Sequence, residues 1–142
     1  MINNKKIQEL TKILNQEPSL ILCSNDEKSP DIETIRFSYN GIEGSPLETY
    51  NLYITVGMAT ADMNCDECKN IELSAFSHRE YLGELEGDYI ATIVNWFAHY
   101  PFIEDSFLEH TEIFEWDTPF AHDSLMQNIF FSLYPAGQES IL

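Results

Sequence analysis

Hydrophobic and polar residues alternate most regularly along two stretches, Ile32–Tyr39 and Thr49–Met58. Alternation with a period of two predicts β-strands, and in the first stretch we expect only one face to lie in the core. The turn-rich residues 40–46 between them predict an antiparallel hairpin with a long loop. Gly57 ends the second stretch, because glycine accepts backbone angles that a Cβ forbids.

Two segments instead show the periodicity of a helix. Apolar residues three and four apart predict a helix over residues 4–15 that ends before Pro18. A stronger apolar stripe predicts a second helix over Asp88–Tyr100. Asp88 is expected to cap its start, and Pro101 is expected to stop it.

Four shorter apolar runs complete the expected elements and indicate further strands. They are Ser19–Cys23, Ile71–Ser77, His110–Phe114 and Asn128–Tyr134. The pattern predicts an α+β fold with a mixed, mainly antiparallel β-sheet flanked by helices. A chain of 142 residues with 44% hydrophobic residues fits one domain, residues 1–142, with a packed core.

The charge balance adds a feature that the pattern does not show. The chain has 24 acidic and 7 basic residues, a formal net charge of −17. No lysine or arginine follows Arg79, so most of the excess lies in the second half. Such a field repels nucleic acid and anionic membranes and attracts basic protein surfaces, although plain solubility would also explain it.

Cysteine content and the N-terminus indicate a cytoplasmic protein. Three cysteines, an odd number, fit a reducing compartment. The first residues contain no continuous apolar stretch typical of a secretion signal, and no run approaches the length of a membrane span.

Few residues indicate chemistry. Cys65 and Cys68 form a CxxC that could supply half of a zinc site, but no second ligand pair accompanies it, and two loop thiols are the simpler interpretation. The histidines His78, His99, His110 and His122 stand singly, with no nucleophile motif. We therefore predict no enzymatic activity, no metal and no cofactor. Helix-terminal His99 would favour the helix dipole if protonated.

Aromatic residues concentrate in the second half of the chain. Most are expected in the core, but some fall in expected loops, and exposed aromatics rimmed by carboxylates would form a protein-binding patch. These residues are Trp96, Phe97, Phe102, Phe107, Phe114, Trp116, Phe120, Phe130 and Phe131.

An ordered set of motifs resembles the suppressor of fused-like domain family. The segment LYITVGM (Leu52–Met58) resembles its strand and T-x-G-M turn, and IELSAF (Ile71–Phe76) resembles the next strand, which opens with an acidic residue and Leu. Downstream, IVNWFAHYP (Ile93–Pro101), LEHTEI (Leu108–Ile113) and IFFSLYP (Ile129–Pro135) follow in the family's order. The chain departs from the family at Glu109, where a glycine is usual, and at Ala59, often serine.

The resemblance implies a mixed sheet flanked by helices and a non-catalytic binding role. Small bacterial members are often immunity proteins of polymorphic toxin systems, whereas animal members clamp a peptide as an added strand. We therefore expect an acidic immunity protein that occludes a basic toxin, such as a nuclease; the alternative is a peptide-binding adaptor that acts by β-strand addition. The expected contact residues are acidic ones in loops: Asp62, Asp66, Glu67, Glu84, Glu86, Glu104 and Asp105.

Overall fold

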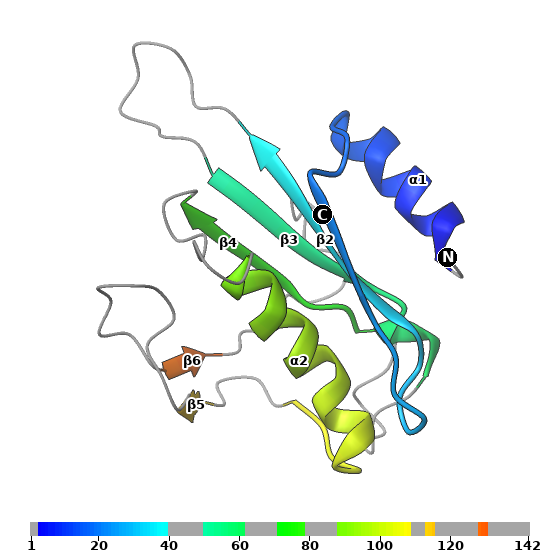
Figure 1. Cartoon of the computed structure of the whole chain (residues 1–142), viewed down its shortest axis with the longest axis vertical. Coiled ribbons are helices and arrows are strands. Elements are labelled where there is room, and N and C mark those ends of the chain that lie inside the picture. Colours follow the sequence, from blue (N-terminus) through cyan, green and yellow to red (C-terminus); the bar gives the residue numbers. More distant parts are fainter. Residues whose placement is uncertain are drawn as a thin grey trace.

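The computed structural model describes residues 3–39, 50–61, 71–78, 88–108, 113–115 and 128–130. Figure 1 shows two helices, a main sheet and a short second sheet. In chain order the elements are α1 (Asn4–Leu14), β1 (Leu20–Ser24), β2 (Ile32–Tyr39), β3 (Tyr50–Val56), the 3₁₀ turn η1 (Met58–Thr60), β4 (Ser74–His78), α2 (Tyr89–Ile103), β5 (Ile113–Glu115) and β6 (Asn128–Phe130).

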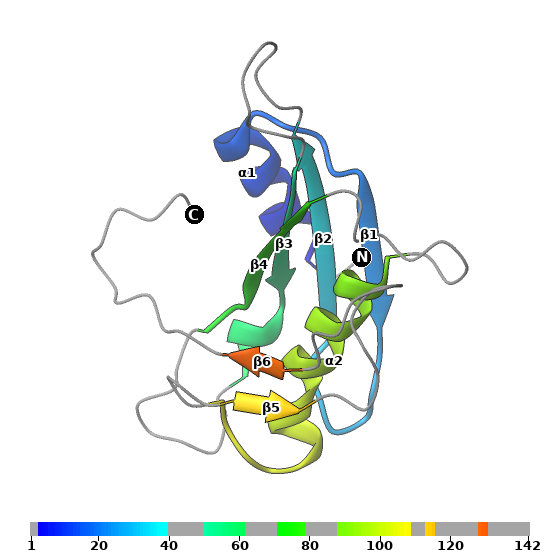
Figure 2. The same cartoon turned by 90° about the vertical axis from the view of Figure 1, so that its left-hand side faces the viewer.

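The main sheet has the strand order β1-β2-β3-β4, and each neighbouring pair is antiparallel. Strands β2 and β3 form the expected hairpin, with Phe37 opposite Leu52. Strands β5 and β6 pair separately. Figure 2 shows the sheet from its side, with α1 on one face and α2 on the other. The fold is therefore α+β, as the sequence predicted.

The face under α1 is an apolar core. Alternate residues of β2 and β3 meet there, and Ile35, Phe37 and Leu52 are almost completely buried. Helix α1 contributes Ile7, which is buried, and Leu10 and Leu14, which are partly buried, so the apolar stripe that predicted the helix packs against the sheet. Ile13 lies beside that stripe and is 71% exposed.

The opposite face corrects the expectation that β2 has only one buried side. Helix α2 packs over Thr34, which is inaccessible to solvent, and over Tyr53 of β3. Residues that alternation assigned to the polar side therefore lie under a helix. They are buried because they form hydrogen bonds there, which offsets the cost of removing polar groups from water.

Asp88 fixes the start of α2 against the sheet. Its carboxylate accepts a hydrogen bond from the backbone N–H of Ala91, which caps the helix as predicted. The same side chain forms an ion pair of 3.0 Å with Arg36 and accepts a hydrogen bond of 2.7 Å from the Tyr53 hydroxyl. One side chain thus links the helix to both central strands.

Pro101 does not stop α2, contrary to the prediction. The helix continues to Ile103, and Pro101 is fully buried inside its last turn. The helix ends instead where Asp105 adopts a positive φ of 49° and the N–H of Ser106 bonds the carbonyl of Pro101. This pattern of hydrogen bonds is a Schellman motif. Pro101 has no N–H to donate within the helix, but so near the end of α2 this loss has little effect on the helix.

Gly57 and Glu72 join the end of β3 to the start of β4. Gly57 has a φ of 114°, and a Cβ there would lie 2.1 Å from the carbonyl oxygen of Asp31. The Glu72 carboxylate accepts hydrogen bonds of 3.1 Å from the backbone N–H groups of Gly57, Met58 and Ala59. Burial raises the pKa of Glu72, and these hydrogen bonds lower it in part.

The same arrangement explains why β4 begins later than predicted. The N–H of Leu73 bonds the Thr55 hydroxyl rather than a strand carbonyl, so the regular ladder starts at Ser74. Of the predicted strand at His110–Phe114, residues 113 and 114 belong to β5, and residues 110–112 lie outside the described residues. Of the last predicted strand, residues 128–130 form β6, and the rest lies outside the described residues. In the described part of the chain, neither helix has the length and apolar character needed to cross a lipid bilayer.

Candidate functional site

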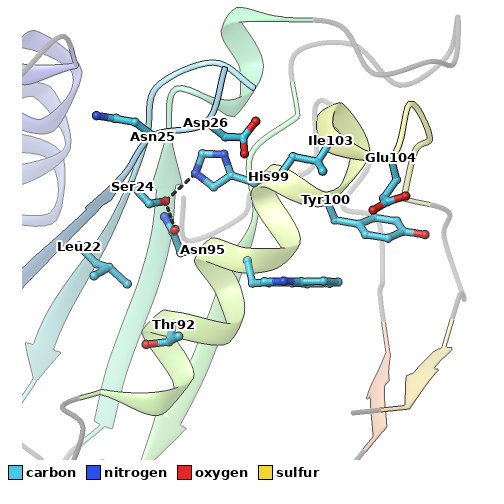
Figure 3. A pocket seen from close by; sticks show the side chains of 11 residues that line it. Leu22, Ser24, Asn25, Asp26, Thr92, Asn95, His99, Tyr100, Ile103 and Glu104 are labelled. Carbon is cyan, nitrogen blue, oxygen red and sulfur yellow. Dashed lines mark hydrogen bonds between the residues drawn. The ribbon is translucent and has the colours of Figure 1, made fainter. Parts of the chain in front are cut away.

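Polar side chains connect α2 to the edge of the sheet beside β1. The Ser24 hydroxyl donates a hydrogen bond to the side-chain oxygen Oδ1 of Asn95. The side-chain nitrogen Nδ2 of Asn95 donates to the Thr34 hydroxyl at 3.0 Å. His99, one turn further along α2, contacts the Ser24 oxygen at 2.7 Å and the Ser29 oxygen at 2.6 Å. Figure 3 shows Ser24 between Asn95 and His99. These contacts hold α2, β1 and the connection to β2 in one arrangement.

Both ring nitrogens of His99 are hydrogen-bonded to serine hydroxyls. Nε2 lies 2.7 Å from the Ser24 oxygen, and which of the two groups donates depends on the tautomer of the ring. Nδ1 lies 2.6 Å from the Ser29 oxygen, and the same hydroxyl donates to the Pro30 carbonyl at 3.3 Å. Burial lowers the pKa of His99, and the nearby carboxylates of Asp26 and Asp31 oppose this in part.

This geometry bears on nucleophilic chemistry at Ser24. A serine nucleophile needs a hydrogen bond in which its hydroxyl donates to the base. Here the Ser24 hydroxyl donates to the side-chain amide oxygen of Asn95 and also contacts Nε2 of His99. Ser24 thus joins Asn95 and His99 in one hydrogen-bonded network. The expected dipole role of a protonated His99 is also wrong, because α2 continues to Ile103 and buries the ring.

A pocket of about 430 Å³ opens above this network, between β1 and α2. Its inner wall consists of Leu22, Ser24, Asn95 and His99, and its outer wall is formed by the exposed side of α2. Pockets of this size accept a small molecule or part of a peptide. A second cavity, of about 380 Å³, lies beside α1.

The outer wall combines aromatic rings with carboxylates. Trp96 is 48% exposed, and its ring centroid lies 5.5 Å from that of Tyr100, with the planes inclined by 31°. Ile103, 36% exposed, extends this apolar surface by one turn. Asp26 and Glu104 line the same pocket, and both are exposed. Figure 3 shows Glu104 beside the ring of Tyr100, and Asp26 beside His99.

The structure locates only part of the acidic set expected to contact a partner. Glu104 and Asp105 follow α2, and both are exposed. Glu104 lines the pocket, whereas Asp105 takes the left-handed backbone position that ends the helix. The other five predicted residues lie outside the described residues: Asp62, Asp66, Glu67, Glu84 and Glu86.

Several pocket residues were not among the predicted contact residues. Asn95 and His99 are polar residues one turn apart within the most apolar helix of the chain. That spacing was the sequence signal for a hydrogen-bonded site on α2, because polar residues on the same side of a buried helix need partners. Ser24 and Asp26 gave no such signal, since their role depends on β1 lying beside α2.

No metal-binding arrangement is present among the described residues, where no three His, Cys, Asp or Glu side chains are placed to share an ion. Cys23, on β1, is a free and exposed thiol. The CxxC residues Cys65 and Cys68 lie outside the described residues, as do His110 and His122. The prediction that Cys65 and Cys68 bind no metal therefore stays untested by the structure, and metal analysis of the purified protein is its test.

Comparisons with known proteins return no relatives. The chain matches no family model, no curated protein and no solved structure.

Proposed function

We propose that this protein is a non-catalytic binding domain of the suppressor of fused-like type, an immunity protein that occludes a basic toxin. The observation that carries the proposal is the pocket between β1 and α2. Its lining includes the half-exposed ring of Trp96, the partly buried ring of Tyr100 and the exposed carboxylates of Asp26 and Glu104, on a chain of net charge −17. Aromatic anchors with a charged rim are typical of protein-binding sites.

The contacts between Gly57 and Glu72 support the family part of the proposal. Two of the motifs in that ordered set are the T-x-G-M turn and the Glu-Leu pair that opens the next strand. In this chain the acidic residue of the second motif accepts hydrogen bonds from the backbone N–H groups of Gly57 and Met58 in the first, and from that of Ala59 directly after it. The two motifs thus form one structural unit, which gives a physical reason for their occurrence together.

Charge supports a basic partner. Toxins that act on nucleic acid need cationic clefts, and complementary fields accelerate association by roughly 10- to 1,000-fold at low salt. The test is affinity capture from the source organism with the purified protein. We expect a protein with a basic toxic domain, whose activity is suppressed at equimolar ratio and whose association slows steeply as salt rises.

A matched pair of variants makes that test specific to the pocket. The double variant Asp26→Asn/Glu104→Gln removes two charges at the pocket, and Glu9→Gln/Glu17→Gln removes two exposed charges on the α1 side. The first should weaken binding of the captured toxin more than the second. Capture of no toxic partner, or an association rate that is independent of salt, would contradict the proposal.

Strand addition is the second candidate function, and the position of β1 favours it. Within the described residues β1 pairs only with β2, so its other edge faces away from the sheet beside the pocket. A peptide added there would gain backbone hydrogen bonds as well as pocket contacts. This mode predicts backbone-amide shifts along β1 on peptide binding, with weak dependence on salt.

A further inference from the structure

The pocket beside β1 has the chemistry of a receptor for one particular side chain. Among the residues that the structure describes, its lining contains Asp26 and Glu104 but no lysine or arginine, and burial lowers the pKa of His99, which favours the neutral ring. A cation that enters therefore meets two carboxylates and, in this described lining, no opposing formal charge. An anionic group would meet those same carboxylates, which excludes phosphate or carboxylate ligands.

The aromatic wall restricts the cation further. Trp96 and Tyr100 present neighbouring rings inclined by 31°, and Trp96 is half exposed. A planar guanidinium stacks on such rings and can also form paired hydrogen bonds with a carboxylate at its edge. An ammonium group is compact and more strongly hydrated, so it uses the rings less well.

We infer that the pocket between β1 and α2 receives an arginine side chain of the protein partner, stacked on Trp96 and Tyr100 and paired with Asp26 or Glu104. The pocket volume of about 430 Å³ leaves room for the long aliphatic stem of arginine beside Leu22 and Ile103. The inference rests on the proposed function in one respect, that a protein supplies the arginine. In this inference the acidic pocket anchors the partner by binding one side chain, rather than only attracting it through the overall negative charge.

The test uses short peptides, so it does not depend on the toxin. Isotopically labelled protein is titrated at low salt with acetyl-Gly-Arg-Gly-amide and with its citrulline counterpart, which has the same shape but no charge. The readout is the indole N–H signal of Trp96, assigned with the Trp96→Phe variant. We expect saturable binding of the arginine peptide, at least about tenfold tighter than that of the citrulline peptide.

Two variants test the location of the site. Asp26→Asn/Glu104→Gln should weaken the arginine peptide by about tenfold, whereas Glu9→Gln/Glu17→Gln should change binding by less than about twofold, although both remove two charges. Equal weakening by the two pairs would overturn the pocket in favour of the overall field. Equal binding of the citrulline peptide, or of a lysine peptide, would overturn the assignment to a guanidinium.

The outcomes also separate this inference from the proposed function. A captured toxin that is neutralised by a protein without affinity for the arginine peptide would refute the inference and leave the function standing. Pocket-specific binding of the peptide by a protein that neutralises no toxin would refute the proposed function and leave the inference standing.

Discussion

Both faces of the main sheet pack against a helix through apolar clusters, and the α2 face adds hydrogen bonds between side chains of the sheet and the helix. Under α1 the alternate residues of the central strands are apolar, and they pack against Ile7. Under α2 the same strands present Thr34, Arg36 and Tyr53, each of which bonds a polar group of α2 or its cap. Apolar packing stabilises the fold but does not depend on direction, whereas hydrogen bonds require a specific geometry and therefore fix the position of α2 on the sheet.

The pocket follows from this difference. Because polar side chains hold α2 at the β1 edge, the outward side of the helix keeps its aromatic residues accessible beside the strand. Under α1 the described side-chain hydrogen bonds across this face lie at the two ends of the helix, where Asn3 and Gln16 donate to backbone carbonyls. We therefore expect that substitutions under α1 change stability alone, and that substitutions under α2 change stability and the pocket together.

The largest expected effect comes from the α1 face. Phe37 is completely buried there, and Phe37→Ala should lower the free energy of unfolding by about 4 kcal/mol through lost burial and a cavity. Urea denaturation measures it. Phe76 lies on the same face of β4 but is 54% exposed, so Phe76→Ala is the control and should cost about 1 kcal/mol or less. Equal losses would mean that burial on this face does not control stability.

Asp88 tests the polar face and should give the second largest effect. Asp88→Ala removes the cap of α2 and leaves Arg36 and the Tyr53 hydroxyl without this partner, which should cost about 3 kcal/mol. Asp88→Asn retains a capping oxygen and should lose about half as much. If both variants were as stable as the parent in urea, the hydrogen bonds of this face would not determine the position of α2.

How much of this contrast could be predicted from sequence differs between the faces. The strands, the hairpin, both helices and the Asp88 cap followed from local patterns at Ile32–Tyr39, Thr49–Met58 and Asp88. The burial of Thr34 did not, because a polar residue at an alternate position is expected in water unless a distant helix covers it. The prediction that Pro101 ends α2 was wrong because a proline near the end of a helix costs few hydrogen bonds.

The candidate site was less predictable than the fold. The sequence drew attention to exposed aromatics with carboxylates, and Trp96 with Glu104 fits that description. It could not place Asp26 or Leu22 beside them, since some 70 residues separate β1 from α2 in the chain. Contacts of that kind depend on the order of strands in the sheet, which no local pattern encodes.

The smallest expected effect is a pH dependence that originates at His99. Burial lowers its pKa, so below about pH 6.5 the unfolded chain binds a proton more readily than the folded one. Stability should therefore fall as the pH falls through this range. His99→Gln lacks this contribution, so acidification should lower the unfolding free energy of the parent more than that of the variant. A difference independent of pH would show that the ring is not desolvated in solution.

Asn3 has a consequence for the order of folding. Its side-chain amide donates to the backbone carbonyls of Asp31 and Val56, both at 3.1 Å, and these meet only where β2 begins and β3 ends. The start of α1 thus has no docking point until the hairpin has closed. Asn3→Ala should accelerate unfolding by about tenfold in stopped-flow measurements and leave the refolding rate nearly unchanged, because the bond forms after the rate-limiting step. Slower refolding of the variant would instead place α1 in the nucleus, ahead of the sheet it covers.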